Sequence, residues 1–233
     1  MKRPPSSDGH DALLCLIEIP EFHGMSDLML LWRLWLTQPR QIATWAPSGA
    51  GVAAAFVDAI AAAPDDGTIV ELGAGTGPVT AAILAAGVDR ERLCIVEANA
   101  ELAGHLRQRF GRDLVARADA RALDSFFEAR RIDRVAAVVS TLPILHFGRT
   151  AQRAVLDDCF ARAAPGATFT QITYLPGSPV RQRQLRSWGY CGERFRRVAN
   201  NWPPATLWQY RPRDIKPCGD RYRDVCLGRL DSE

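Results

Sequence analysis

The sequence lacks the features expected of a membrane-spanning or disulfide-bonded protein. It contains no stretch of about 18 uncharged apolar residues, so no spanning helix is expected. The six cysteines include no C-x-x-C pair, which favours free thiols over a disulfide framework or a zinc site. The polar residues 1–10 lack the basic-then-apolar order of a signal peptide. We therefore expect a cytoplasmic location and no metal centre, which leaves contact with a membrane surface open.

Net charge is also low. A value of +3 does not mark a general nucleic-acid binder, so no nucleic-acid partner is expected. Almost all of the positive charge is arginine, whose planar guanidinium suits phosphate, although a mere compositional bias would look the same. With 233 residues and 47% hydrophobic content, the chain fits one sizeable globular domain whose oligomeric state stays open.

Apolar runs typical of buried strands alternate with helical patterns through most of the chain. Strands are expected at 68–72, 93–96, 113–118, 135–140, 167–174, 194–199 and 205–211. Helices are expected between them at 78–86, 99–109, 150–163 and 180–188. This alternation predicts an α/β fold with a doubly wound, mostly parallel sheet of seven strands and helices on both faces. Because little separates the last two strands, we expect them to form an antiparallel hairpin at one edge.

A helical section precedes the first strand. Helices are expected over 26–37 and 50–63, so that the main domain runs from 26 to 211. Residues 1–25 and 212–233 are expected to be an N-terminal extension and a polar C-terminal tail.

The loop after the first strand carries the clearest chemical motif. The motif begins with Glu71 near the end of the strand and continues in the loop with Gly73, Ala74, Gly75 and Gly77. Ligands of open α/β sheets bind at the carboxyl ends of the strands, where glycines let the backbone approach closely. The spacing is G-x-G-x-G, because proline occupies the third-glycine position of the dinucleotide fingerprint G-x-G-x-x-G. The motif is typical of Rossmann-like class I methyltransferases, which predicts S-adenosylmethionine as cofactor and S-adenosylhomocysteine as product.

Two acids follow the next strands. Glu97, with Ala98 beside it, ends the second strand, where a carboxylate can accept hydrogen bonds from both ribose hydroxyls. Asp119, with Ala120, follows the third strand, where an acid can accept a hydrogen bond from the adenine amino group. Each could also be an ordinary solvated acid, but their register with the glycine loop favours a cofactor site.

The fourth strand ends in the sequence Ser140-Thr-Leu-Pro-Ile144. Amino methyltransferases often carry N-x-P-[YF] or D-P-P-Y here, in which the polar group and a carbonyl hold the amine. Ser140 takes the polar position, with Leu142 and Pro143 as expected substrate contacts. Ile144 stands where a ring would stack on a flipped base, which counts against a nucleobase substrate.

Several segments resemble bacterial phospholipid N-methyltransferases, relatives of the ribosomal-RNA adenine dimethyltransferases. Residues 140–143 are similar to the S-x-L-P motif of that family, and 169–180 to its Q-x-T-Y…S-P stretch. Residues 201–208 are similar to its P-P-A-x-[VL]-[WY] segment, and 38–49 to its N-P-[KR]…P-S-S entry, with glycine in place of the second serine. The resemblance spans about 27–211 and implies methylation of phosphatidylethanolamine or a related amino lipid.

The same resemblance implies a protein bound peripherally to the anionic inner membrane surface. The segment 28–36 is apolar apart from Arg33, and helical spacing places Trp32 and Trp35 on one face. A core-packing helix or a dimer contact would have the same pattern. A second basic face could hold phosphate or be a solvated surface, and is expected to contain Arg181, Arg183, Arg186, Arg194, Arg196 and Arg197.

Three residues are candidates for the chemical step. The amine must lose a proton before it can attack a methyl group. Tyr174, near the end of the fifth strand, or His146, after the fourth, could accept that proton or a hydrogen bond. Backbone carbonyls at Ser140 to Leu142 could orient the amine. The alternatives left open are an RNA adenine methyltransferase, a methyltransferase of a small soluble amine, and a cofactor-binding protein without catalysis.

Overall fold

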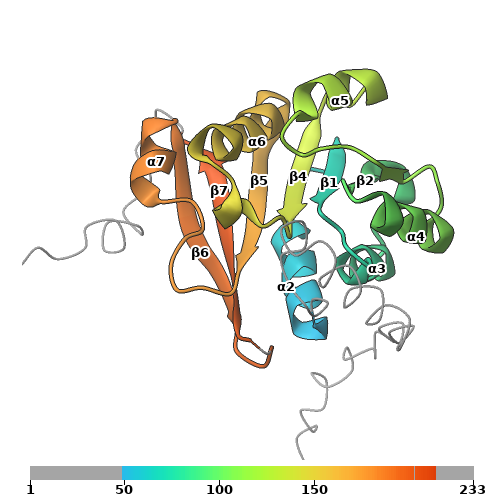
Figure 1. The fold of residues 1–233 in the computed structure, drawn as a ribbon, viewed down its shortest axis with the longest axis horizontal. Coiled ribbons are helices and arrows are strands. Elements are labelled where there is room, and N and C mark those ends of the chain that lie inside the picture. The colour runs from blue at the N-terminus through green and yellow to red at the C-terminus, as the bar shows by residue number, and fades with distance from the viewer. Residues whose placement is uncertain (1–48, 202, 214–233) are drawn as a thin grey trace, which may run out of the picture.

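The computed structural model describes residues 49–201 and 203–213, and the chain forms one seven-stranded sheet in the order β3-β2-β1-β4-β5-β7-β6 (Figure 1). The strands are β1 (Thr68–Leu72), β2 (Leu93–Val96), β3 (Val115–Ala116), β4 (Val135–Ser140), β5 (Ala163–Thr173), β6 (Tyr190–Val198) and β7 (Ala205–Pro212). The first five strands pair in parallel, whereas β7 pairs antiparallel with both β5 and β6. The expected Rossmann-like fold of class I methyltransferases is confirmed.

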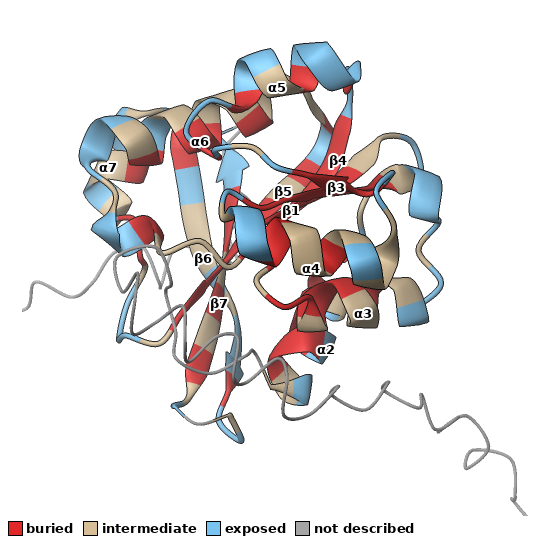
Figure 2. Cartoon of the chain, turned by 45° about the vertical axis from the view of Figure 1, so that its right-hand side comes forward, coloured by how far each residue is buried: buried red, intermediate tan, exposed pale blue. Residues whose placement is uncertain are grey.

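Two helical layers cover the sheet (Figure 2). One face packs against α2 (Ala50–Ile60), α3 (Pro78–Ala85) and α4 (Ala100–Phe110). The other packs against α5 (Leu123–Arg130), α6 (Arg149–Ala161) and α7 (Gln182–Ser187). Because both faces are covered, the central strand β4 is buried at every residue, as its uninterrupted apolar sequence predicts.

The antiparallel hairpin at the sheet edge is also confirmed. Its inner strand is the last in sequence: β7 lies between β5 and β6, which leaves β6 at the edge. A register shift between Arg194 and Arg196 places two consecutive residues of β6 opposite one residue of β7. The hairpin also begins earlier than expected, at Tyr190, whose hydroxyl donates a 2.5 Å hydrogen bond to Asp157 of α6.

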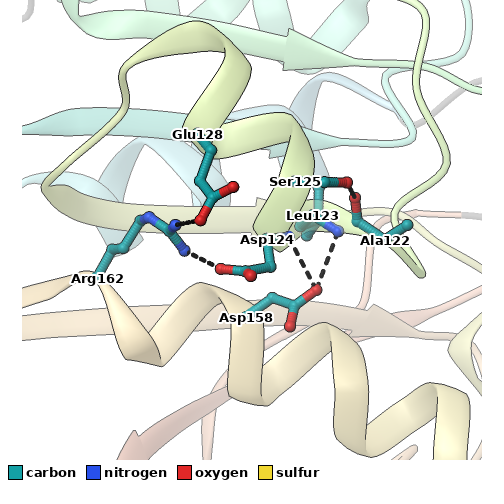
Figure 3. Close-up of polar contacts among 7 residues, drawn as sticks. All are labelled: Ala122, Leu123, Asp124, Ser125, Glu128, Asp158 and Arg162. Carbon is teal, nitrogen blue, oxygen red and sulfur yellow. Dashed lines mark hydrogen bonds and ion pairs between the residues drawn. The ribbon is translucent and has the colours of Figure 1, made fainter.

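Helix α5 is absent from the sequence-based expectation. Its N-cap residue, Ala122, offers no side-chain acceptor. Instead, Asp158 of α6 accepts hydrogen bonds from the backbone N–H groups of Leu123 and Asp124, at 2.9 and 3.1 Å (Figure 3). Arg162, at the end of α6, forms ion pairs with Asp124 and Glu128 of α5 (Figure 3). A neighbouring helix therefore supplies the capping groups that the local sequence lacks.

The N-terminal helical section is described only in part. Helix α2 lies where the second helix was expected and ends at Ile60 rather than at residue 63. The expected helix over 26–37, with Trp32, Arg33 and Trp35, lies outside the described residues, as do 1–25 and 214–233. Within the described ranges, no helix combines the length and apolar character needed to cross a membrane.

Candidate functional site

The chain order of the strands reverses between β1 and β4, which are hydrogen-bonded neighbours at the centre of the sheet. In open α/β sheets this switch point opens a crevice at the carboxyl ends of the strands. The glycine loop after β1 and the segment after β4 both begin there. The backbone N–H of Thr141 donates to the Leu72 carbonyl at 3.0 Å, and its hydroxyl donates a short hydrogen bond to the carbonyl of Gly73. Thr141, which the sequence analysis did not single out, thus ties the two loops together.

The three glycines of the loop after β1 adopt positive φ angles: +75° at Gly73, +62° at Gly75 and +89° at Gly77. At Gly77 a Cβ would lie 2.4 Å from the ring of Phe110, so this glycine allows close packing on α4. At Gly75 a Cβ would meet nothing within 4 Å. The backbone at Gly75 therefore faces open space, and Ala74 beside it is buried. An open backbone flanked by glycines is what close approach of a ligand requires.

Glu97 fastens this loop to the end of β2. One carboxylate oxygen accepts a hydrogen bond from the Gly75 N–H at 3.1 Å, and the other from the Asn99 N–H at 2.9 Å. Burial raises the pKa of Glu97, and backbone hydrogen bonds from Asn99, Gly75 and Ala98 oppose the rise. An ionised carboxylate has about four acceptor positions, so the three backbone hydrogen bonds leave capacity for a ligand hydroxyl.

Glu71 lies beneath the loop and is fully buried. Its carboxylate accepts a 2.6 Å hydrogen bond from the Thr80 hydroxyl and another from the Thr80 backbone, which places the acid at the positive end of α3. The other oxygen, Oε1, is buried and has no partner among the residues that the structure describes. Burial raises the pKa of Glu71 to about 7, and the charge of Glu97 adds to the rise. Glu71 thus supports the loop from below by joining the end of β1 to the first turn of α3.

Asp119 lies in the turn after β3, exposed beside the buried Ala120. Both of its oxygens accept hydrogen bonds from the Arg121 guanidinium, the closest at 2.5 Å. These bonds hold the pKa of Asp119 below its ordinary value. The carboxylate is therefore charged and fixed in orientation at the third strand end.

The segment after β4 depends on a glutamine that the sequence analysis did not name. Ser140 is fully buried, and its hydroxyl accepts a 3.4 Å hydrogen bond from the Leu142 N–H. Gln171, opposite Ser140 on β5, donates from Nε2 to the carbonyls of Leu142 and Ile172, each at 2.9 Å. The Oε1 of Gln171 is buried and has no partner within the described part of the chain. The only sequence signal for this residue was its place in the segment resembling Q-x-T-Y.

The candidate acid–base residues occupy different surroundings. Tyr174 follows the end of β5, is half-buried and packs against the cluster formed with α2, α3 and α4. His146 is exposed in a short 3₁₀ helix, Ile144–His146, which begins after Pro143. The Gln152 side chain of α6 fixes that turn by donating to the Ile144 carbonyl at 2.9 Å. In the part of the chain that the structure describes, no cluster of histidine, cysteine or acidic residues could hold a metal.

Two family-like segments far apart in the sequence meet at the start of α2. The backbone N–H of Gly49 donates to the Asn201 side chain at 3.3 Å. A Cβ at residue 49 would lie only 2.6 Å from that same oxygen. Asn201 in turn donates to the Pro203 carbonyl at 2.7 Å. The glycine that departs from the paired-serine pattern therefore permits a close contact with the segment 201–208.

Comparison with known proteins agrees with this geometry. No protein-family model matches the chain. It is 31% identical over 167 residues to an ornithine lipid N-methyltransferase from Singulisphaera acidiphila, a match covering 70% of this chain and 77% of that protein. The chain belongs to the family of this N-methyltransferase. With its glycine loop and Glu97, it is an S-adenosylmethionine-dependent methyltransferase of class I.

Solved structures share the fold at lower identity. The glycopeptide N-methyltransferase MtfA, complexed with sinefungin, superposes with a TM-score of 0.52 at 15% identity, over 72% of this chain and 87% of that one. A precorrin-6y C5,15-methyltransferase from Geobacter metallireducens superposes with a TM-score of 0.50 at 15% identity, over 69% and 87%. MtfA was also solved with S-adenosylmethionine and with S-adenosylhomocysteine.

Proposed function

We propose that this enzyme methylates the primary amine of phosphatidylethanolamine or of a related amino lipid at a membrane surface. The observation that carries the proposal is the 31% identity to a methyltransferase named for an amino lipid, ornithine lipid. The segments at 140–143, 169–180 and 201–208, which resemble phospholipid N-methyltransferases, support it independently. The identity of the amino lipid depends on the residues that would contact the acceptor.

The residues around the glycine loop fit S-adenosylmethionine. The open side of Gly75 leaves room for a ligand against the backbone. Gly77, the N-cap residue of α3, supplies no side-chain cap. The positive end of this helix, where Glu71 accepts from Thr80, would also attract the carboxylate of the methionine part. Glu97 would accept the ribose hydroxyls, with Ala98 beside it, and Asp119 and Ala120 would lie against the adenine.

S-adenosylmethionine supplies an electrophilic methyl group: the amine nitrogen forms the new N–C bond while the C–S bond breaks and its electron pair stays on sulfur. The chain has to present that nitrogen without its extra proton and in line. We assign this positioning to the segment from Ser140 to Pro143, which Gln171 and Thr141 hold rigid. Tyr174 and His146 remain the proposed acceptors of the amine proton or of a hydrogen bond from it.

A nucleobase substrate is disfavoured by the surroundings of residue 144. Ile144 is only 1% exposed and belongs to the core beneath α6. It therefore offers no surface on which a flipped base could stack. The low net charge points the same way. A small soluble amine remains the second candidate, because the same fold serves many amines.

The test is methyl transfer from labelled S-adenosylmethionine to four acceptors in parallel: vesicles with phosphatidylethanolamine, vesicles with ornithine lipid, unmethylated ribosomal RNA and free ethanolamine. The proposal expects label in a chloroform-soluble lipid, and thin-layer separation would then count the methyl groups added. Label found only in RNA or only in ethanolamine would refute a lipid substrate. A Glu97→Ala variant, expected to lose cofactor binding, controls for contaminating activity.

A further inference from the structure

The register of the sheet extends a line of side chains from the candidate site to the edge strand. Ser140 of β4 lies opposite Gln171 of β5, which lies opposite Trp208 of β7, which lies opposite Arg194 of β6. Directly paired residues point to the same face of a sheet. The row lies on the face covered by α6 and α7, because the neighbouring row Val138–Phe169–Tyr210 belongs to that core.

A second row lies one step nearer the carboxyl edge. Thr173 of β5 pairs with Thr206 of β7, which pairs with Arg197 of β6. Since β7 is antiparallel to both neighbours, β6 runs parallel to β5 and ends at the same edge as β4 and β5. The register shift in β6 keeps Arg194 and Arg197 on the same face although they are three positions apart. The first row therefore leads from Ser140 to Arg194, and the second leads from the end of β5 to Arg197.

These two arginines differ from the others on the hairpin. Arg196 lies on the opposite face and forms an ion pair with Asp58 of α2, so the prediction of one basic face is wrong for this residue. Arg211 pairs with Glu193. Arg194 and Arg197 are exposed, and no ion pair or hydrogen bond joins either side chain to the described residues. A guanidinium presents donors in a fork that matches a carboxylate or a phosphate. Among residues 49–201 and 203–213, neither of these two forks has an acidic partner.

The two arginines must reach across β7 if they are to share one headgroup with the segment after β4. Adjacent strands lie about 4.8 Å apart, so β6 lies about 10 Å from β5 and about 14 Å from β4. The long arginine stems can lie back over β7 and shorten that separation. The only side chains between them in the two rows are hydroxyls, an amide and an indole. The indole Nε1 of Trp208 and the Oε1 of Gln171 are buried without partners, so the rows also contain polar capacity that the described residues do not use.

We propose that Arg194 and Arg197 bind the acidic group of the amino-lipid acceptor, while its amine lies at the segment Ser140–Pro143. This deepens the proposed function and rests on it. The acidic group is the phosphate if the acceptor is phosphatidylethanolamine and the carboxylate if it is ornithine lipid. Both arginines are specificity-determining residues, since they contact the part of the substrate that does not react. They set the Michaelis constant for the acceptor rather than the rate of transfer.

The test compares three acceptors, each presented in phosphatidylcholine vesicles: phosphatidylethanolamine, ornithine lipid and a long-chain primary amine without an acidic group. In the double variant Arg194→Gln/Arg197→Gln, KM for the acidic acceptor rises at least about tenfold, or about 1.4 kcal/mol, with little change in kcat. KM for the plain amine stays within about twofold. The matched control is Arg196→Gln, which removes the same charge from the same strand on the opposite face and leaves KM unchanged.

The following results would overturn the proposal. An equal loss on the plain amine, or a loss that appears only when anionic phosphatidylglycerol is added, would overturn the proposal in favour of general membrane attraction; vesicle co-sedimentation would then fall in parallel. An unchanged KM for the acidic acceptor would overturn it while leaving the proposed function intact. A wild-type enzyme that methylates none of the three lipids would overturn both. If the double variant unfolds, the two single variants replace it, each with an expected rise of about threefold.

Discussion

The two halves of the sheet build their parts of the site in different ways. On the β1–β2 side, the glycine loop and Glu97 lie within 27 positions of one another, and hydrogen bonds from Gly75 and Asn99 hold the Glu97 carboxylate. On the β4–β7 side, Ser140, Gln171 and Trp208 meet only through strand register. The proposed cofactor half is thus encoded by residues close in sequence, whereas the proposed substrate half is assembled over long range. Within the described ranges both halves keep a buried polar atom without a partner: Glu71 in the first, Gln171 and Trp208 in the second.

The largest effect on the difference between the two halves is expected from a substitution in the glycine loop. We expect Gly75→Val to weaken binding of S-adenosylhomocysteine at least about 100-fold, because a β-branched side chain disfavours a φ of +62° and fills the open side of the loop. Isothermal titration calorimetry measures the loss. Gly87→Val is the matched control, since Gly87 also has a positive φ, +85°, and open space around its Cβ, but lies at the far end of α3. If both variants bind equally well, the loop does not hold the cofactor.

The second prediction concerns pH and Glu71. Its folded pKa of about 7 lies above the ordinary 4.5, so the folded state binds the proton more tightly than the unfolded state. The associated stability is fully present below pH 4.5 and is lost as pH rises through 7, by at most about 3 kcal/mol. We expect the free energy of unfolding of the Glu71→Gln variant to depend less on pH across this range than that of the wild-type protein. Urea unfolding at several pH values measures this, and parallel curves for the two proteins would contradict it.

A smaller effect is expected on the substrate half. Gln171→Leu removes the donor that holds the Leu142 carbonyl, so the segment Ser140–Pro143 loosens. We expect KM for the lipid acceptor to rise about tenfold with cofactor binding unchanged. Gln209→Leu is the control: this buried glutamine of β7 bonds instead to Ala59 and Thr170 on the opposite face. Equal kinetic losses in both variants would reduce Gln171 to a stability role.

The smallest effect is expected at Tyr174. Tyr174→Phe removes one hydroxyl near the end of β5 and is expected to slow turnover about threefold to tenfold while cofactor affinity changes less. Tyr190→Phe serves for comparison, since it deletes the hydroxyl bonded to Asp157 at the opposite end of the sheet. Single-turnover rates and calorimetry separate the two quantities. An unchanged rate in Tyr174→Phe would remove this residue from the mechanism.

Much of the fold was predictable because its signals are local. Continuous apolar runs located the central strands, and β1, β2 and β4 begin and end as expected. Helix α5 was not predictable, because Asp158 and Arg162 of another helix cap and anchor it. The place of β7 inside the hairpin was not predictable either, because a short connection fixes that two strands pair and not which of them joins β5.

The sequence by itself determined the cofactor motif, since glycine spacing and strand-end acids act through the backbone conformation of adjacent residues. It also indicated a lipid N-methyltransferase, which the match to an ornithine lipid N-methyltransferase supports, whereas phosphatidylethanolamine as the substrate stays a prediction. The tertiary structure decided which groups lie close together. These are the hydrogen bond from Gln171 to the Leu142 carbonyl, the contact of Gly49 with Asn201, and the rows that end at Arg194 and Arg197. It also decided the pKa of Glu71, because burial is a property of packing and not of composition.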